Sequence, residues 1–273
     1  MFQVQAEMAD DGDKVSLSQL SRWFGVPRRT LYYKPTKAAP RVNPVLAKKV
    51  KDLIDELPFA GYRTIAFLLG LNRNTVQRIN QIKGWQCRKR QIGFRPRAQA
   101  MPSVAQRPNE RWATDLTRVW CGQHDRWMTL SAVIDCHTRE ILGWRLSRRG
   151  NAKTAEATLE DALVNRFGSL ARTVQPLTLR SDNGLVFTSR RFTVTVRSYG
   201  IKQEFITPHT PQQNGMIERL FRTIKEQCIW LHNFKNFEEA QTTIGQWVTW
   251  YNTQRPHQAL NMKTPQQAFE LAA

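Results

Sequence analysis

The sequence lacks the features that mark membrane and secreted proteins. No stretch approaches the roughly 18 uninterrupted apolar residues that a membrane-spanning helix needs. The start, MFQVQAEMADDGDK, has neither the apolar segment nor the cleavage site of a secretion signal. Cysteine is scarce, with four residues and no CxxC pair, and the five histidines form no HxxxH set. We therefore expect no zinc knuckle or disulfide framework, and we predict a cytoplasmic protein with reduced thiols.

Acidic residues are also in short supply. The chain of 273 residues has 22 Asp and Glu against 41 Lys and Arg, which gives a net charge of +19 at pH 7. Between residues 60 and 100 the sequence contains no Asp or Glu at all. A positive field of this size attracts polyanions, so nucleic acid is the expected partner. A basic protein whose charges are dispersed over a solvated surface is the alternative.

Residues 1–38 contain a candidate helix-turn-helix. In the segment VSLSQLSRWFGVPRRTLYYKP, apolar residues keep helical spacing up to Gly25, which permits a turn, and Pro27 suits the start of a second helix. This pattern places Arg28 and Arg29 on the second helix, which in such motifs enters the major groove of DNA. A small helical packing element without DNA contact is the alternative.

Residues 39–105 predict a second module of the same kind, followed by a basic linker. Apolar residues with helical spacing indicate three helices, separated at Pro58 and Gly70. Arg73 and Arg78 are the candidate DNA-contacting residues of the third helix. The following segment, CRKRQIGFRPRAQAMPSVAQRP, has Pro, Gly and Arg without periodicity, which is typical of a linker or an extended arm. Its basic candidates for contact with DNA are Arg88, Lys89 and Arg90.

From residue 106 to residue 235 the pattern changes to strands. The segments RWATDLTRVW, WMTLSAVIDC and REILGWRLS are short and rich in β-branched and aromatic residues, which indicates three antiparallel strands. A helix, the strand LTLRSD, a second helix, the strand IKQEFIT and a third helix follow. This order predicts a ribonuclease H-like α/β catalytic core with a mixed five-stranded sheet, preceded by the all-α helix-turn-helix modules.

Three carboxylates stand out in this core. Asp115 interrupts an apolar strand, where a carboxylate is unusual unless it is paired or binds a metal. Asp182 ends the fourth strand, and Glu218 lies on the last helix. In the predicted fold the first and fourth strands are neighbours and the last helix packs across them, so the three side chains can converge.

Carboxylates without His or Cys suit Mg2+ or Mn2+ rather than zinc. Two such ions can activate an attacking oxygen and stabilise a leaving oxygen in a phosphoryl displacement. On the last helix Arg222 and Lys225 share a face with Glu218 and can point at a common ligand. A solvated row of salt bridges is the alternative for that stripe.

The spacing of these residues resembles that of a known family. The gap between Asp182 and Glu218 holds 35 residues (218 − 182 − 1), and Lys225 follows the glutamate by seven. This is similar to the D, D, thirty-five, E pattern of retroviral integrases and bacterial insertion-sequence transposases. The segments WATDLTRVW, VIDCHTREILGW, RSDNGLVFTS, ITPHTPQQNGMIER and YNTQRPHQAL resemble the second reading-frame product (OrfB type) of the IS-three family. The zinc-binding module of the integrases is not part of this resemblance, and two helix-turn-helix candidates stand in its position.

The resemblance implies a DNA transposase that cleaves transposon ends and transfers strands with two Mg2+ or Mn2+ ions per active site. Asp115, Asp182 and Glu218 would be the metal ligands, and Lys225 would contact the transposon end. The loops beside the metals would be shaped by Asn183, Gly184, Asn214 and Gly215. We expect the two glycines to allow a positive φ or a close backbone approach, with plain turn positions as the alternative.

The resemblance also implies partners and a place of action. These are double-stranded DNA of the transposon ends and the target, further copies of the chain, and a protein from an upstream reading frame, in the bacterial nucleoid. Two other functions stay open on the residues alone. A sequence-specific DNA-binding regulator explains the basic front half, and a ribonuclease H-like nuclease without joining activity explains the carboxylates.

The remaining polar residues and the C-terminal segment are expected to be structural. Asp125, Asp135 and Glu140 lie at strand turns, where such residues are more often turn formers than ligands. Residues 236–273 predict a helical extension that packs against the catalytic core, with His257 in a structural role.

Overall fold

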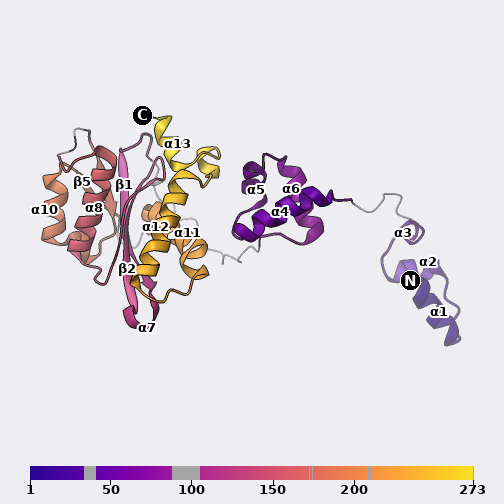
Figure 1. Cartoon of the computed structure of the whole chain (residues 1–273). Coiled ribbons are helices and arrows are strands. Elements are labelled where there is room, and N and C mark those ends of the chain that lie inside the picture. Colours follow the sequence, from indigo (N-terminus) through magenta and orange to yellow (C-terminus); the bar gives the residue numbers. More distant parts are fainter. Residues whose placement is uncertain (34–40, 88–104, 172, 174, 208–210, 273) are drawn as a thin grey trace. The chain divides into compact units, whose positions relative to one another are not determined.

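The computed structural model describes residues 1–33, 41–87, 105–171, 173, 175–207 and 211–272. The chain divides into two compact units, Met1–Ala47 and Lys48–Ala273. Figure 1 labels their helices and strands. In the described part of the chain no helix is long and apolar enough to cross a membrane. The predicted linker residues Arg88, Lys89 and Arg90 lie outside the described residues.

The first unit holds three helices, α1 (Phe2–Asp10), α2 (Leu17–Trp23) and α3 (Arg28–Leu31). A capping box starts α2, because Ser16 accepts from the Gln19 backbone N–H and the Gln19 side chain accepts from that of Ser16. Gly25 follows with a φ of +62°, which lets the chain turn. The two helices predicted around Gly25 are confirmed, although the second is a single turn. The sequence prediction missed α1, which begins without a side-chain cap.

Three more helices match the second predicted module: α4 (Pro44–Glu56), α5 (Tyr62–Leu68) and α6 (Arg73–Lys83). Asn72 caps the start of α6, and Gly84 ends it with a φ of +70°. Apolar side chains are buried where α5 and α6 pack together, namely Ile65, Val76 and Ile79. Arg73 and Arg78 lie on the exposed side of α6.

A five-stranded sheet lies at the centre of the remaining chain. Its strands are β1 (Arg111–Trp120), β2 (Trp127–Asp135), β3 (Ile141–Ser147), β4 (Thr178–Ser181) and β5 (Lys202–Phe205). They lie in the order β3-β2-β1-β4-β5. The pairs β1–β2 and β2–β3 are antiparallel, whereas β1–β4 and β4–β5 are parallel. The predicted mixed sheet and ribonuclease H-like order of elements are confirmed, with β1 in the middle.

Helices cover both faces of this sheet (Figure 1). One face carries α8 (Ala152–Phe167) and α10 (Arg190–Ser198), and the other carries α11 (Gly215–Gln227) and α12 (Phe237–Thr253). The strand β2 is buried at every residue but its first, as expected for a strand covered on both sides. Short elements complete the fold: α7 (Gly122–Asp125), α9 (Leu185–Thr188), η1 (Pro211–Asn214), η2 (Ile229–Leu231), η3 (Gln258–Leu260) and α13 (Pro265–Glu270).

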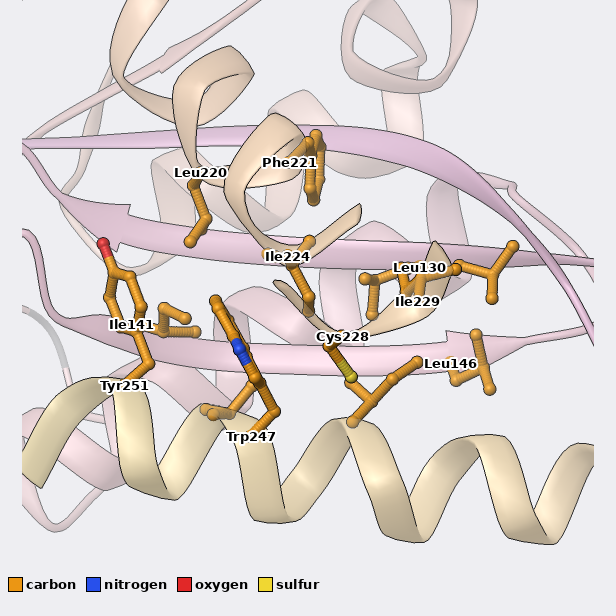
Figure 2. Packing of buried hydrophobic residues seen from close by; sticks show 14 of the residues in the cluster. Leu130, Ile141, Leu146, Leu220, Phe221, Ile224, Cys228, Ile229, Trp247 and Tyr251 are labelled. Carbon is orange, nitrogen blue, oxygen red and sulfur yellow. The ribbon is translucent and has the colours of Figure 1, made fainter. Parts of the chain in front are cut away.

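The helical extension predicted for residues 236–273 is part of the core. Figure 2 shows Trp247 and Tyr251 of α12 facing strand residues such as Ile141. Its buried side chains are Ala240, Ile244, Trp247, Val248 and Tyr251, and they join α11 in one apolar cluster. Asp125, the last residue of α7, accepts from the Phe237 backbone N–H at 2.8 Å and so bonds the first turn of α12, whose N-cap is Asn236.

On the opposite face, α8 approaches β3 closely at Gly143. A Cβ atom at this position would lie 2.4 Å from the Thr158 carbonyl oxygen and 2.8 Å from the Ala162 backbone nitrogen. Both atoms belong to the helix backbone, which cannot move away as a flexible side chain can. Because Gly143 has no Cβ atom, α8 can pack this close to the sheet.

We predict that Gly143→Ala lowers the free energy of unfolding by about 1–3 kcal/mol or more, because the new methyl group must push α8 away from β3. Thermal melting and urea unfolding of the purified chain would measure the loss. Gly215→Ala is the control, since a Cβ there meets no atom within 4 Å. Equal stability of the two variants would contradict this account of the helix–sheet contact.

Candidate active site

Asp115 lies on the central strand β1, and its strand neighbour β4 leads directly to Asp182. The parallel register pairs Ala113 with Arg180. Asp115 comes two residues later on β1, and Asp182 directly follows the last residue of β4, so both residues lie just beyond the paired segment at the same end of the parallel pair. The convergence expected from the predicted topology is thereby present for these two residues.

Each of the two aspartates accepts one local backbone hydrogen bond. Leu116 N donates to Asp115 Oδ1 at 2.7 Å, and Gly184 N donates to Asp182 Oδ1 at 2.9 Å. A Cβ atom on Gly184 would lie 2.9 Å from the same Asp182 oxygen. The close approach expected of Gly184 is therefore observed.

The alternative expectation of a positive φ is wrong for both glycines. Gly184 has a φ of −63°, and Gly215 is the first residue of α11 and is not among the positive-φ residues of the described chain. No atom lies within 4 Å of a Cβ built on Gly215. At that position a glycine is an ordinary helix start.

Glu218 reaches the site from α11. The apolar side of this helix is buried through Ile217, Leu220, Phe221 and Ile224, three of which are seen in Figure 2. Glu218 and Arg222 are consequently turned to the exposed side, and Lys225 is partly buried. Arg222 Nε lies 3.1 Å from Glu226 Oε1, so it forms an ion pair within the helix.

The electrostatics of Asp115 show that these side chains act on one another. Burial raises the pKa of Asp115, and with the nearby charges of Asp182 and Glu218 it brings that pKa to about 7. The Leu116 hydrogen bond and the charge of Lys225 act in the opposite direction. The charges of Asp182 at the end of β4 and of Glu218 and Lys225 on α11 therefore lie within Coulombic range of Asp115 on β1.

This donor set fits a hard divalent cation in its chemistry, because it offers carboxylate oxygens and no thiolate or imidazole. A cation would also offset the burial and the repulsion that together raise the pKa of Asp115. Within the described residues, however, no three His, Cys, Asp or Glu side chains are close enough together to hold one metal ion. The structure places the carboxylates within Coulombic range of one another, but not around one point.

The other predicted loop residues have structural partners or are buried. Asn183 Nδ2 donates to the Ile206 carbonyl oxygen at 2.8 Å, linking the end of β4 to the end of β5. Asn214 is buried, and its Oδ1 has no hydrogen-bond partner in the described structure. These residues shape the edge of the sheet from which Asp182 projects.

Arg180 is a site residue that the sequence analysis missed. It is buried on β4, and its guanidinium donates to Glu204 Oε2 at 2.8 Å and to the Gln213 carbonyl oxygen at 2.7 Å. Glu204 also accepts from Arg111 Nε at 3.2 Å. Arg180 thus ties the strand that carries Asp182 to the segment that leads into α11. A charged residue inside the apolar strand LTLRSD was the available signal, as it was for Asp115.

The remaining acidic candidates have structural roles, as expected. Asp135 is fully buried and accepts backbone N–H donors from Asn109, His137 and Thr138 at 2.7 to 3.0 Å. Glu140 pairs with Arg166 at 2.7 Å. His257 is buried beside Tyr251, in keeping with its predicted structural role.

The predicted DNA-contacting residues outside the core are described in their own modules. Arg28 and Arg29 form the start of α3 and are exposed. Arg73 and Arg78 are exposed on α6. Both pairs are therefore available to a polyanion.

Comparison with known proteins identifies relatives of this chain. Two family profiles, each described as integrase core domain, match residues 105–211 and 199–265. The chain is 28% identical over 276 residues to the putative transposase InsK for insertion sequence element IS150 of Escherichia coli (strain K12), covering 91% of this chain and 92% of that protein. It is 25% identical over 231 residues to the transposase InsD for insertion element IS2A/D/F/H/I/K of Escherichia coli, covering 80% and 76%.

Among solved structures, similarity extends to two viral integrase structures. The simian T-cell lymphotropic virus intasome in complex with PP2A regulatory subunit B56 gamma matches with 17% identity and a TM-score of 0.49, over 81% of this chain and 74% of that chain. The HTLV-2 integrase catalytic core domain in complex with magnesium (trimeric form) matches with 20% identity and a TM-score of 0.43, over 60% and 98%.

We predict that Asp135→Asn lowers the free energy of unfolding by about 1.5–3 kcal/mol, because three backbone N–H donors, one buried and two partly buried, lose their charged acceptor. Asp161→Asn, which breaks only a partly exposed pair with Arg145, should cost less than about 1 kcal/mol. Asp115→Asn should leave stability unchanged or higher, since it removes a charge repelled by Asp182 and Glu218. Urea unfolding in a chelating buffer distinguishes them, and an equally large loss in Asp115→Asn would contradict the division into structural and functional acids.

Proposed function

We propose that this chain, which belongs to the insertion-sequence transposases with a retroviral integrase-like core, cleaves DNA at transposon ends and joins them to target DNA by means of Asp115, Asp182 and Glu218. DNA transposition and integration follow from the relatives and from the integrase core domain. The catalytic roles of these three side chains and the metal-dependent mechanism are what we propose in addition.

One observation carries this proposal. Three acidic side chains from separate elements lie close enough that the charges of Asp182 and Glu218 add to burial in raising the pKa of Asp115. A fold gains no stability from such mutual repulsion. Like charges brought together at a sheet edge, against the stability of the fold, are typical of a site that binds a cation during function.

The three carboxylates would hold Mg2+ or Mn2+, two ions per active site. When bound, these ions supply Lewis-acid activation of the attacking oxygen and stabilisation of the leaving oxygen. Asp115 and Asp182 are fixed in position by their strands, and α11 presents Glu218. Arg180 donates to the Gln213 carbonyl oxygen in the segment before α11. It therefore helps to hold α11, which carries Glu218, in a fixed position relative to β4, which leads to Asp182.

Basic residues would position the DNA. Lys225 lies near enough to lower the pKa of Asp115, and its proposed role is to contact a phosphate of the transposon end. Arg222 lies one turn from Glu218 on the same helix face. Arg28, Arg29, Arg73 and Arg78 are proposed to engage DNA through the two N-terminal helical modules, with Arg88, Lys89 and Arg90 of the linker.

We also propose the wider setting. Holding two transposon ends together calls for more than one copy of the chain, and a protein from an upstream reading frame is a proposed partner. Both are extensions from the family resemblance. A DNA-binding regulator would bind DNA without cutting it, and a nuclease would cut without joining, so a joining assay separates these alternatives from a transposase.

We predict that Asp115→Asn, Asp182→Asn and Glu218→Gln each reduce cleavage and joining by more than about 1,000-fold, because each removes a ligand of the catalytic cations. DNA binding should remain largely intact, since most phosphate contacts are made elsewhere. The assay joins a labelled DNA end to a target plasmid in Mg2+ or Mn2+, with gel shifts in parallel.

Asp161→Asn is the matched control, because it removes one carboxylate from α8 and should keep wild-type activity. Full joining in a chelator, or by any of the three active-site variants, would show that the metal mechanism is wrong. Cleavage without joining in the wild-type chain would favour a nuclease.

We predict that Lys225→Ala weakens engagement of the transposon end by about 1–3 kcal/mol, the range for hydrogen bonds to charged groups, without lowering the melting temperature. Lys225→Arg should recover part of this, because the charge matters more than its shape. Cleavage measured against DNA concentration reports the effect, with Lys153→Ala on α8 as the control. Wild-type cleavage by Lys225→Ala at limiting DNA would make Lys225 a surface lysine.

A further inference from the structure

Three arginines line one pocket on the side of α11 that faces the C-terminal segment. Arg139 lies in the turn between β2 and β3, Arg219 on α11 directly after Glu218, and Arg255 just beyond α12. Tyr251 and His257 complete the part of the lining that matters here. We call this the arginine pocket. Nothing in the proposed cleavage and joining chemistry uses it.

The arginine pocket has no carboxylate to balance its charge. Among the described residues that line it there is neither Asp nor Glu. Glu140, next to Arg139 in sequence, is paired with Arg166. Arg255 donates to the neutral Gln227 Oε1 at 3.0 Å, and its Nη1 lies 3.2 Å from His257 Nε2. In the described structure no ion pair is formed by Arg139, Arg219 or Arg255.

The positive charges in this pocket oppose one another. Burial lowers the pKa of Arg139 and the charge of Arg219 lowers it further, while burial and the charge of Arg139 lower the pKa of Arg255. Burial together with Arg255 and Arg139 also lowers the pKa of His257 to about 3, which keeps its imidazole neutral. The pocket therefore has a positive potential that its own side chains do not offset.

The backbone at Arg139 adds an independent sign of function. Its φ is +61°, in the left-handed region that arginine rarely adopts. Glycine or asparagine would relieve this strain at the turn. A strained backbone that directs a charged side chain into a pocket is a feature of ligand-binding sites.

We propose that the arginine pocket binds a phosphate group of the DNA backbone, away from the phosphate that reacts at the three carboxylates. This inference rests on the proposed function, which brings DNA to α11. Guanidinium groups match phosphate oxygens through paired, charge-assisted hydrogen bonds. Because Glu218 and Arg219 are adjacent on α11, one helix serves both the reacting phosphate and this second contact.

The first test measures DNA affinity of the full chain against salt concentration, in a chelator so that no cleavage occurs. The double variant Arg139→Gln, Arg219→Gln should show a slope of log K against log salt that is smaller by about 0.9, the value for one lost phosphate contact. The control is Arg190→Gln, Arg197→Gln, which removes two exposed arginines from α10 and should keep the parent slope. If the Arg139→Gln, Arg219→Gln variant has the same slope of log K against log salt as the parent chain, the proposal is wrong.

The second test distinguishes DNA from free phosphate. Inorganic phosphate should raise the melting temperature of the parent chain above that in chloride at equal ionic strength, and the pocket variant should lose this rise. If that rise is lost while the DNA slope is unchanged, the pocket takes free phosphate and the DNA assignment is wrong. If the double variant melts early, Arg219→Gln alone replaces it, because this residue is exposed on a helix surface.

Joining assays in Mg2+ keep the two proposals apart. A chain that binds DNA with a pocket-dependent slope but never joins DNA supports the arginine pocket and contradicts the transposase mechanism. A chain that joins DNA but whose salt dependence is the same in the pocket variant supports the transposase mechanism and contradicts the arginine pocket.

Discussion

Parallel pairing of β1 with β4 places the end of a short, late strand beside the middle of the first one. Two aspartates that are far apart in sequence come together through this contact, and the packing of α11 across the sheet adds the glutamate. The pairing itself is tied across the sheet by Glu204 of β5, which accepts from Arg111 of β1 and from Arg180 of β4. Loss of that register would separate the carboxylates while leaving every element intact.

Acidic residues in this core fall into two physical classes. Asp135 is surrounded by backbone donors, so its negative charge is satisfied by the fold and stabilises it. Asp115 receives one backbone donor, from Leu116, and lies in the field of two further carboxylates, so the Leu116 hydrogen bond and the charge of Lys225 oppose the effect of burial and repulsion. The same residue type is thus satisfied by the fold at one end of β2 and left largely unsatisfied by it on β1, where we propose a functional role.

Most of the fold could be predicted from local patterns. Periodicity and turn residues located the strands and long helices, and the order of elements implied the neighbours of β1. Asp115 stood out because a charge inside an apolar strand is costly, whereas Asp182 and Glu218 were predicted from the order of elements and from the spacing that resembles a known family. Arg180 is also a charged residue inside an apolar strand, and the sequence analysis overlooked it because its partners Glu204 and Gln213 are distant in sequence.

The arginine pocket could not be predicted from the sequence, because its residues come from a turn, a helix face and a C-terminal segment that only the folded chain brings together. Of the two possibilities predicted for Gly184, the close approach is present and the positive φ is not, because a carboxylate and not a left-handed turn lies beside this residue.

The hydrogen bond between Asp125 and the first residue of α12 has a consequence for how such proteins can be recombined. That helix follows the last carboxylate in sequence, yet its start is bonded to the turn after β1 and its apolar side fills the same cluster as α11. A chimaera that exchanged everything after α11 between two relatives would divide one folding unit. Exchange of modules between relatives is therefore expected to keep the chain from β1 through α12 together.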